Sequence, residues 1–386
     1  MKKIVMTLAL ALSLVFPGLS RAATVKIGFI DSLTGPEAPI GEDLNNGVSL
    51  ALQDLKKMGI TVELVKEDDS GKPDQSMAAL EKLGTRDNVA GIVGPYSSKC
   101  ASAISRLAEK YKVPLIIPVA SKEDITRQPN LKWTFRLSAT TNDYASVLID
   151  MATKLGHPKT MAVIYENTDF GTSGAKSAKE IAAKKGISVV ADEAYSAGSP
   201  DYRATLTKIK ARKPDLVFMV SYVADAILLM RQSREIGLAP QAFLGAGAGF
   251  ANAQFAAQKD ISNDVFSSTQ WTKTVSWPGA KSFGERYKEQ FGKEATYHAA
   301  TAYESMIIMA ETAAKAGGDR EKIREALHTG KWNGIMGEVA FRDYEGYTNQ
   351  NKHQMLVEQI QNGKFETVYP PQFVAGKPVY PFLGWK

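Results

Sequence analysis

Segments of strand character and segments of helix character alternate along this chain, and the alternation limits the fold more than any other feature of the sequence. The first strand is expected at 25–30, and residues 44–58 carry apolar side chains at helical spacing up to Gly59. Further strands are expected at 62–65, 89–93 and 115–117, with helices near 77–83 and 101–111. Short apolar runs of this kind are typical of parallel strands that are buried on both faces.

The same alternation restarts after Asn142. Strands are expected at 161–165, 189–190, 216–220, 243–244 and 265–268, and helices near 172–185, 201–212 and 224–236. Two such blocks predict an α/β protein with two doubly wound parallel sheets. Beyond them the sequence predicts helices without an intervening strand over 283–310, a hairpin-like pair at 338–341 and 355–360, and an irregular proline-rich tail from Tyr369.

Residues 1–22 have the pattern of a cleaved secretory signal. Lys2 and Lys3 precede an apolar stretch, and Ser20-Arg21-Ala22 provides small residues at the cleavage site. A membrane anchor is the alternative, but the apolar stretch is short for a spanning helix and Pro17-Gly18 interrupts it. The pattern predicts a protein of the periplasm.

Charge and cysteine content narrow the class of partner. The formal net charge of the whole chain is +6, and three of its basic residues belong to the predicted signal. The remaining excess is too small and too dispersed to predict a nucleic-acid partner. Cys100 is the only cysteine, so no internal disulfide is expected, and without a cysteine after the signal no lipid anchor is expected.

Two turns in the first block combine strand ends with hydroxyl groups. One is Gly94-Pro95-Tyr96-Ser97-Ser98-Lys99, where a strand gives way to a helix, and the other is Pro118-Val119-Ala120-Ser121. A helix N-terminus with serine hydroxyls suits an anion, although serine also serves as an ordinary N-cap. Because ligands of open parallel sheets bind at the carboxyl ends of the strands, the two turns together are expected to hold one carboxylate.

Three strand ends of the second block are expected to face these turns. They are 165–171, 221–222 and 245–250, in which Phe170 and Tyr222 are either apolar walls of a site or ordinary surface aromatics. The glycine run 245–250 is not a dinucleotide fingerprint, because Phe250 occupies the place of the third glycine. The run instead predicts a backbone that passes close to another group.

Residues for catalysis are not recognisable. The four histidines are scattered without metal-ligand spacing, and neither a Gly-x-Ser-x-Gly elbow nor a phosphate-binding P-loop occurs. We therefore expect no enzyme activity, no metal and no cofactor.

Several of these motifs, in order and spacing, resemble the leucine/isoleucine/valine-binding proteins, a branch of the type I periplasmic binding proteins. They include Ile27-Gly28-Phe29, Leu33-Thr34-Gly35-Pro36, Val93-Gly94-Pro95 and Asp169-Phe170-Gly171. The resemblance implies two lobes joined by a three-stranded hinge, which close on a small ligand and then meet an inner-membrane ABC permease. It also implies a monomer. The lobes implied are 23–142 with 273–334, and 143–272 with 335–386.

The resemblance also implies roles for single residues. The carboxylate-binding serine falls on Ser98, and a second clamp falls on Val119 and Ser121. Aromatic residues that close over the ligand fall on Phe170 and Tyr222. With the pocket wall expected at Trp271, the predicted binding set is Tyr96, Ser97, Ser98, Val119, Ala120, Ser121, Phe170, Tyr222, Gly247 and Trp271.

One departure from the family bears on the ligand. The glutamate that holds the ammonium of an amino acid is replaced here by Gly247, and a tyrosine near the start is replaced by Ile40. A buried ammonium without an anion is costly, and Asp225 is the remaining candidate acceptor. The sequence therefore predicts import of a small carboxylate, such as a branched-chain amino acid or a related acid. A binder of an aromatic acid or amide, and a ligand sensor for a membrane receptor, remain as alternatives.

Overall fold

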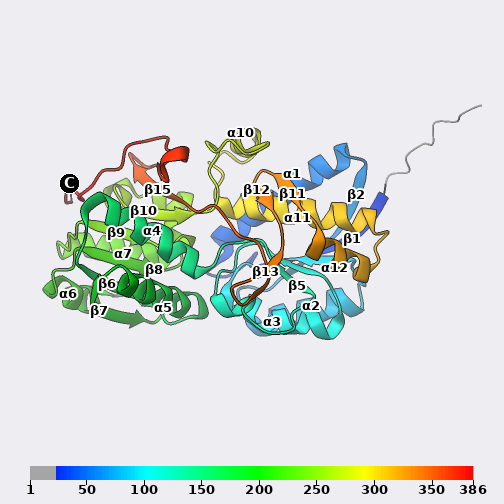
Figure 1. The fold of residues 1–386 in the computed structure, drawn as a ribbon, viewed down its shortest axis with the longest axis horizontal. Helices are drawn as coiled ribbons and strands as arrows, with labels where there is room; N and C mark the ends of the chain where they lie inside the picture. Colours follow the sequence, from blue (N-terminus) through cyan, green and yellow to red (C-terminus); the bar gives the residue numbers. More distant parts are fainter. Residues whose placement is uncertain (1–22, 386) are drawn as a thin grey trace, which may run out of the picture.

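The computed structural model describes residues 23–385, which form two lobes side by side (Figure 1). Each lobe contains a seven-stranded sheet with helices on both faces. The predicted α/β class with two sheets is confirmed. The predicted signal at 1–22 lies outside the described residues. No helix among the described residues is both long enough and apolar enough to cross a membrane.

The first sheet has five mutually parallel strands and a hairpin at one edge. Its strands are β1 (Ala23–Asp31), β2 (Ile60–Asp68), β3 (Gly91–Val93), β4 (Leu115–Ile117), β5 (Thr134–Arg136), β13 (Arg342–Tyr344) and β14 (Tyr347–Gln350). Their spatial order is β13-β14-β5-β4-β3-β1-β2. β14 runs parallel to β5, and β13 runs antiparallel to β14.

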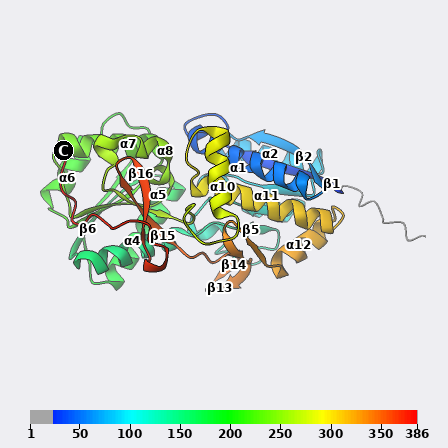
Figure 2. The ribbon, with the colours of Figure 1, turned by 90° about the horizontal axis from the view of Figure 1, so that it is seen from above.

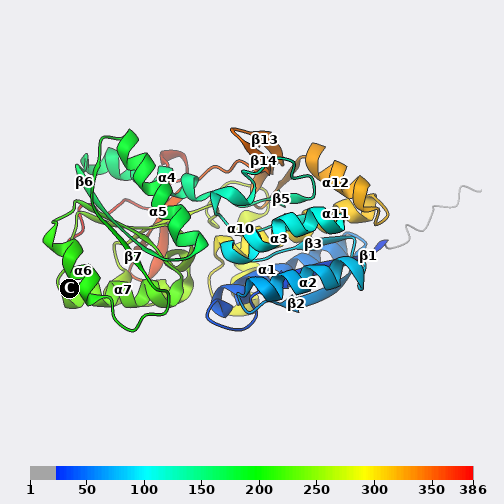
Figure 3. The ribbon, with the colours of Figure 1, turned by 90° about the horizontal axis from the view of Figure 1, so that it is seen from below.

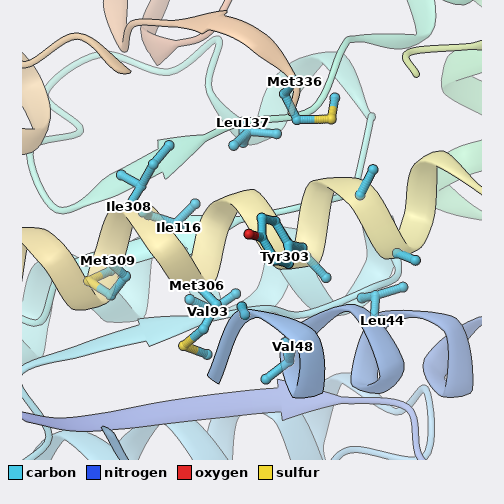
Figure 4. Packing of buried hydrophobic residues seen from close by; sticks show 14 of the residues in the cluster. Leu44, Val48, Val93, Ile116, Leu137, Tyr303, Met306, Ile308, Met309 and Met336 are labelled. Carbon is cyan, nitrogen blue, oxygen red and sulfur yellow. The ribbon is translucent and has the colours of Figure 1, made fainter. Parts of the chain in front are cut away.

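Alternate side chains of these strands enter two separate cores. In β1, Ile27 and Phe29 face one core and Ile30 faces the other, as the two-residue period of a strand requires. The first core is covered by α1 (Ala38–Lys57), α10 (Ala280–Phe291), α11 (Tyr297–Lys315) and α12 (Arg320–Thr329); the second is covered by α2 (Pro73–Thr85) and α3 (Ser98–Tyr111). Figure 2 shows α1 and α11 side by side, and Figure 4 shows Met306 of α11 packed with Val93 and Val48.

The second sheet repeats this arrangement. Its strands are β6 (Thr160–Glu166), β7 (Ser188–Tyr195), β8 (Leu216–Val220), β9 (Ala242–Gly245), β10 (Phe266–Thr269), β15 (Leu356–Gln361) and β16 (Lys364–Tyr369), in the order β16-β15-β10-β9-β8-β6-β7. One face packs on α4 (Thr141–Gly156) and α5 (Asp169–Lys184); the other packs on α6 (Arg203–Ala211), α7 (Val223–Glu235), α8 (Ala253–Ala256) and α9 (Lys259–Ser262).

The strands after residue 330 differ from the prediction. The expected hairpin of 338–341 with 355–360 does not form. Instead β11 (Trp332–Gly334) pairs with β12 (Gly337–Val339), and β15 pairs with β10 and β16. β13 and β14, which the predicted division assigned to the second lobe, belong to the sheet of the first lobe. The β14 strand is too short and too polar to carry an apolar pattern, so its sheet could not be assigned from the sequence.

The chain passes between the two sheets three times, as the predicted three-stranded hinge requires. The crossings follow β5, β10 and β14. Buried amide side chains tie the first crossing to the other two: Gln270 Oε1 accepts from Ala139 N at 2.8 Å, and Gln350 Nε2 donates to Ser138 O at 2.8 Å. Asn351 Nδ2 also donates to Leu137 O at 3.3 Å. The hinge is thus a hydrogen-bonded unit, and α3 and α5 meet across the lobes beside it (Figure 3).

The close approach of α1 to α11 generates a stability prediction. A Cβ at Gly47 would lie 2.1 Å from Ala299 O, whereas a Cβ at Gly84, in the last turn of α2, would meet Tyr111 Cβ at 3.5 Å. We expect Gly47→Ala to lower the free energy of unfolding in urea by about 1–3 kcal/mol, because the two helices must separate. Gly84→Ala is the control and should be neutral or stabilising, since alanine has a higher helix propensity than glycine. Equal stabilities of the two variants would contradict this packing.

Candidate ligand-binding site

A small pocket lies between the lobes, where strand ends of both sheets face each other. The residues that line it are Tyr96, Ser98, Val119, Ala120, Ser121 and Tyr297 from the first lobe and Tyr144, Phe170, Tyr222 and Ala248 from the second. In this closed arrangement the side chains leave a cavity of about 10 Å³. That is about the space of one water molecule, so a ligand has to enter while the lobes are apart.

A larger groove of about 730 Å³ lies at the other end of the first sheet, beside residues 23–26 and 317–321. It borders the amino-terminal end of β1 and contains no residue of the facing lobe. Ligands of open α/β sheets bind at the carboxyl ends of the strands. The interlobe pocket is therefore the candidate site despite its smaller volume.

The two hydroxyl-bearing turns of the first lobe meet at one wall of the pocket. Ser98 is the first residue of α3, and its Oγ accepts a hydrogen bond from Lys122 N at 3.3 Å. This bond joins the turn after β3 to the turn after β4. The Ser98 hydroxyl hydrogen stays available as a donor, because the bond to Lys122 uses only an oxygen lone pair. Within the described residues, the N–H groups of Ala120 and Ser121 donate to no protein acceptor.

Four helices begin at the pocket. Ser98 opens α3, Tyr297 opens α11, Phe170 lies in the first turn of α5, and Tyr222 is the N-cap residue of α7. A helix N-terminus carries roughly half a positive elementary charge and unpaired N–H donors. Their convergence makes the pocket attractive to an anion.

The aromatic side chains of the second lobe contact the first lobe through their rings. The Tyr222 ring lies 5.5 Å from that of Phe170 and 5.7 Å from that of Tyr96, measured between ring centroids. Glu166 at the end of β6 holds both loops: it accepts from Thr168 Oγ1 at 2.6 Å and from Tyr222 N at 3.3 Å. Glu166 is thus a positioning residue for the aromatic wall.

A hydrogen-bonded chain runs from the hinge to the opposite side of the pocket. Gln270 Nε2 donates to Tyr144 Oη at 2.7 Å, and Tyr144 Oη donates to Tyr297 Oη at 3.5 Å. Tyr297 Oη also accepts from Ala248 N at 3.0 Å. Burial raises the pKa of Tyr297 to about 12 and holds the pKa of Tyr144 well above its usual range, so both phenols stay protonated at neutral pH.

Gly247 lies beside the pocket but does not line it. Its backbone has φ +62° and ψ −139°, and a Cβ there would lie 3.2 Å from Tyr297 Oη and 3.3 Å from Tyr144 Cε2. The two tyrosines occupy the space, and the backbone conformation itself favours glycine.

Three further candidates of the sequence lie outside the pocket. Ser97 is the N-cap residue of α3 and is buried next to the lining residue Ser98. Trp271 packs edge-on against Phe283 at 5.5 Å in the core of the first lobe. Asp225, the proposed acceptor for an ammonium group, is buried and accepts from Gly198 N and Tyr202 Oη.

The structure brings together seven of the ten predicted binding residues and adds Tyr144, Ala248 and Tyr297. Ala248 lies in the glycine run 245–250, which the sequence already indicated as a backbone close to another group. Tyr144 lies inside α4, and Tyr297 begins a helix that follows no strand. Neither tyrosine directly follows a strand, so the rule that ligands bind at strand ends does not predict them.

Polar contacts between the lobes surround the pocket. Lys122 Nζ pairs with Asp169 Oδ2 at 2.8 Å, and Glu123 N donates to Ser173 Oγ at 3.2 Å. Asn252 Nδ2 reaches Asp43 Oδ2 at 3.5 Å on another side. Such side-chain contacts can be made and broken as the lobes move about the hinge.

Comparison with known proteins agrees with this architecture. Residues 24–364 match the family described as periplasmic binding protein. The Leu/Ile/Val-binding protein homolog 7 of Brucella suis biovar 1 (strain 1330) is 28% identical over 385 residues, covering 94% of this chain and 96% of that protein.

Solved structures give the same result. The LivJ branched-chain amino acid transporter substrate binding protein of Streptococcus pneumoniae, in complex with isoleucine, has a TM-score of 0.80 at 25% identity, covering 90% of this chain and 100% of its own. A solute binding protein of an ABC transporter from Rhodopseudomonas palustris BisB5, in complex with 3,4-dihydroxy benzoic acid, has a TM-score of 0.80 at 23% identity. The match covers 93% of this chain and 98% of that protein. The second likeness is one of fold alone. Because the family match spans most of the sequence, this chain belongs to the periplasmic binding protein family.

Proposed function

We propose that this chain is the periplasmic solute-binding component of an ABC-type importer. It captures a small carboxylate, such as a branched-chain amino acid or a related acid, and presents the closed form to an inner-membrane permease. The proposal rests chiefly on the interlobe pocket, which is lined by the Ser98 hydroxyl and by residues from the N-terminal ends of four helices. The names of the Brucella and Streptococcus proteins support the same class of function.

In this proposal the first lobe binds first and the second lobe closes. Ser98, Ser121 and the free N–H groups of the turn after β4 hold the carboxylate. Phe170 and Tyr222 then cover it and exclude water. We assign residues 335–350 to the first lobe, because β13 and β14 pair within its sheet, so that the third crossing of the hinge follows Gln350.

No step of this proposal is a chemical reaction. The pocket holds no pair of a nucleophile and a base among the described residues, and its side chains are hydroxyls, rings and alkyl groups. In this proposal the chain binds and releases its ligand, and the importer supplies the energy.

The carboxylate clamp generates a prediction for Ser98→Ala. The variant loses one hydrogen bond to a charged group, which contributes about 1.5–3 kcal/mol. We expect the dissociation constant of the bound acid to rise at least about tenfold in calorimetric titrations of refolded, ligand-free protein. Ser49→Ala on the surface of α1, whose Oγ bonds only to Asn45 O, is the control and should bind as the original protein does. An unchanged affinity of Ser98→Ala would place the carboxylate elsewhere.

Glu166 generates a prediction about pH. Burial raises the pKa of Glu166 from its ordinary 4.5 to about 8. The folded protein therefore retains a proton that the unfolded chain releases between these values, and the contribution of Glu166 to the free energy of unfolding falls as the pH rises from 4.5 to 8.

Glu166→Gln removes this titration. We expect the stability of the variant relative to the original protein to improve by at least about 1 kcal/mol between pH 5 and pH 8 in urea unfolding. Burial raises the pKa of Glu304 to about 7 and that of Glu358 to about 8, but both groups are present in each protein and cancel in the comparison. Exposed Glu180→Gln, on α5, should show no such change. A constant difference between Glu166→Gln and the original protein would mean that Glu166 is ionised in the fold.

A further inference from the structure

We propose, building on the carboxylate-binding function above and removing amino acids from its range, that the ligand carries no ammonium group and has a flat apolar body with a second oxygen, which Tyr297 binds. A hydroxylated aromatic acid, such as 4-hydroxybenzoate, has this chemistry. The inference rests on the charges around the pocket and on the hydroxyl groups inside it.

The described residues lining the pocket include no carboxylate. An acidic side chain at position 247 would face Tyr144 and Tyr297. It would also need a backbone conformation that residues other than glycine rarely adopt. An ammonium in this pocket would therefore have no anion built to receive it.

The acidic residues near the pocket are engaged elsewhere. Glu37 pairs with Lys99 at 2.9 Å, and Asp169 pairs with Lys122. Asp225 accepts from Tyr202 and Gly198, and Glu123 accepts from Asn142 N at 2.7 Å. Glu166 accepts from the two loops that carry Phe170 and Tyr222. Recruiting any of these to an ammonium would break a contact that holds a pocket loop or joins the lobes.

The helix N-termini also disfavour an ammonium group in the pocket. Four positive helix ends that favour a carboxylate also repel a cation placed beside it. A buried, unpaired ammonium would weaken binding by roughly a hundredfold or more. A quaternary ammonium held by aromatic rings meets the same repulsion, although rings alone attract such cations.

Two phenol hydroxyl groups of the pocket, those of Tyr96 and Tyr297, indicate what replaces the ammonium. Tyr297 Oη receives hydrogen bonds from Ala248 N and Tyr144, and its own hydrogen has no acceptor among the described residues. Tyr96 Oη is buried and has no hydrogen-bond partner in the described chain. Both phenols line the pocket, so a ligand oxygen there would accept from Tyr297, and a ligand hydroxyl would also offer a hydrogen to Tyr96.

The walls of the pocket are largely aromatic. The rings of Tyr96, Phe170 and Tyr222 lie next to one another and present faces and edges on which a planar ring stacks. This favours an aryl body over a branched alkyl chain, which gains no such geometry.

The test is a calorimetric titration of refolded, ligand-free protein with matched pairs of ligands. One pair is leucine and 4-methyl-2-oxopentanoate, which differ in the ammonium group, and the other is benzoate and 4-hydroxybenzoate, which differ in one hydroxyl. We expect 4-hydroxybenzoate to bind tightest, about tenfold or more tighter than benzoate, as one buried hydrogen bond implies. Leucine should bind at least about a hundredfold more weakly than 4-methyl-2-oxopentanoate, because it carries the ammonium group.

Tyr297→Phe identifies the group that binds the hydroxyl. The variant should lose the preference for 4-hydroxybenzoate while its affinity for benzoate changes less than about threefold. Tyr303→Phe, on the same helix and outside the pocket, is the control and should keep the preference. If Tyr297→Phe does not fold, the preferences of the original protein decide the question alone.

The outcomes separate this inference from the function it rests on. Tightest binding of leucine overturns the inference and leaves carboxylate capture intact. Tightest binding of 4-methyl-2-oxopentanoate overturns the aromatic body. Binding of no carboxylate in the panel overturns both the inference and the proposed function.

Discussion

The rest of the structure depends on hydrogen bonds across the hinge, which the buried amide side chains of Gln270, Gln350 and Asn351 make. They join the three crossings of the chain, so that both sheets keep their strand ends directed at one another. Each lobe is assembled from segments distant in the sequence, and each relies on the hinge to bring those segments together. The pocket exists only because these segments meet.

The same hinge links binding to closure. Gln270 contacts both the first crossing and Tyr144, and Tyr144 leads to Tyr297 in the other lobe. The wall of the pocket is thus connected to the axis about which the lobes would move. The Tyr96–Tyr222 ring contact and the Lys122–Asp169 ion pair complete the closed form. A ligand that adds contacts to both lobes stabilises this form over the open one by its difference in affinity for the two.

The sequence predicted the elements with a strong apolar pattern and the site residues that follow strands. Ser98, Ser121, Phe170 and Tyr222 were found because strand ends of parallel sheets share one edge. Tyr297 was not found, since it opens a helix that no strand precedes. The short polar strands near 342–350 and the packing of Trp271 depend on tertiary contacts that a local pattern does not encode.

Small-angle X-ray scattering of ligand-free protein, with and without the tightest-binding carboxylate, tests the central claim most directly. The claim is that two lobes close on a carboxylate at the interlobe pocket. The account predicts a smaller radius of gyration at saturating ligand, and a ligand-bound profile close to that of the two lobes in their closed arrangement (Figure 1). Superimposable profiles from a protein that binds its ligand would contradict the account, because binding would then proceed without lobe closure.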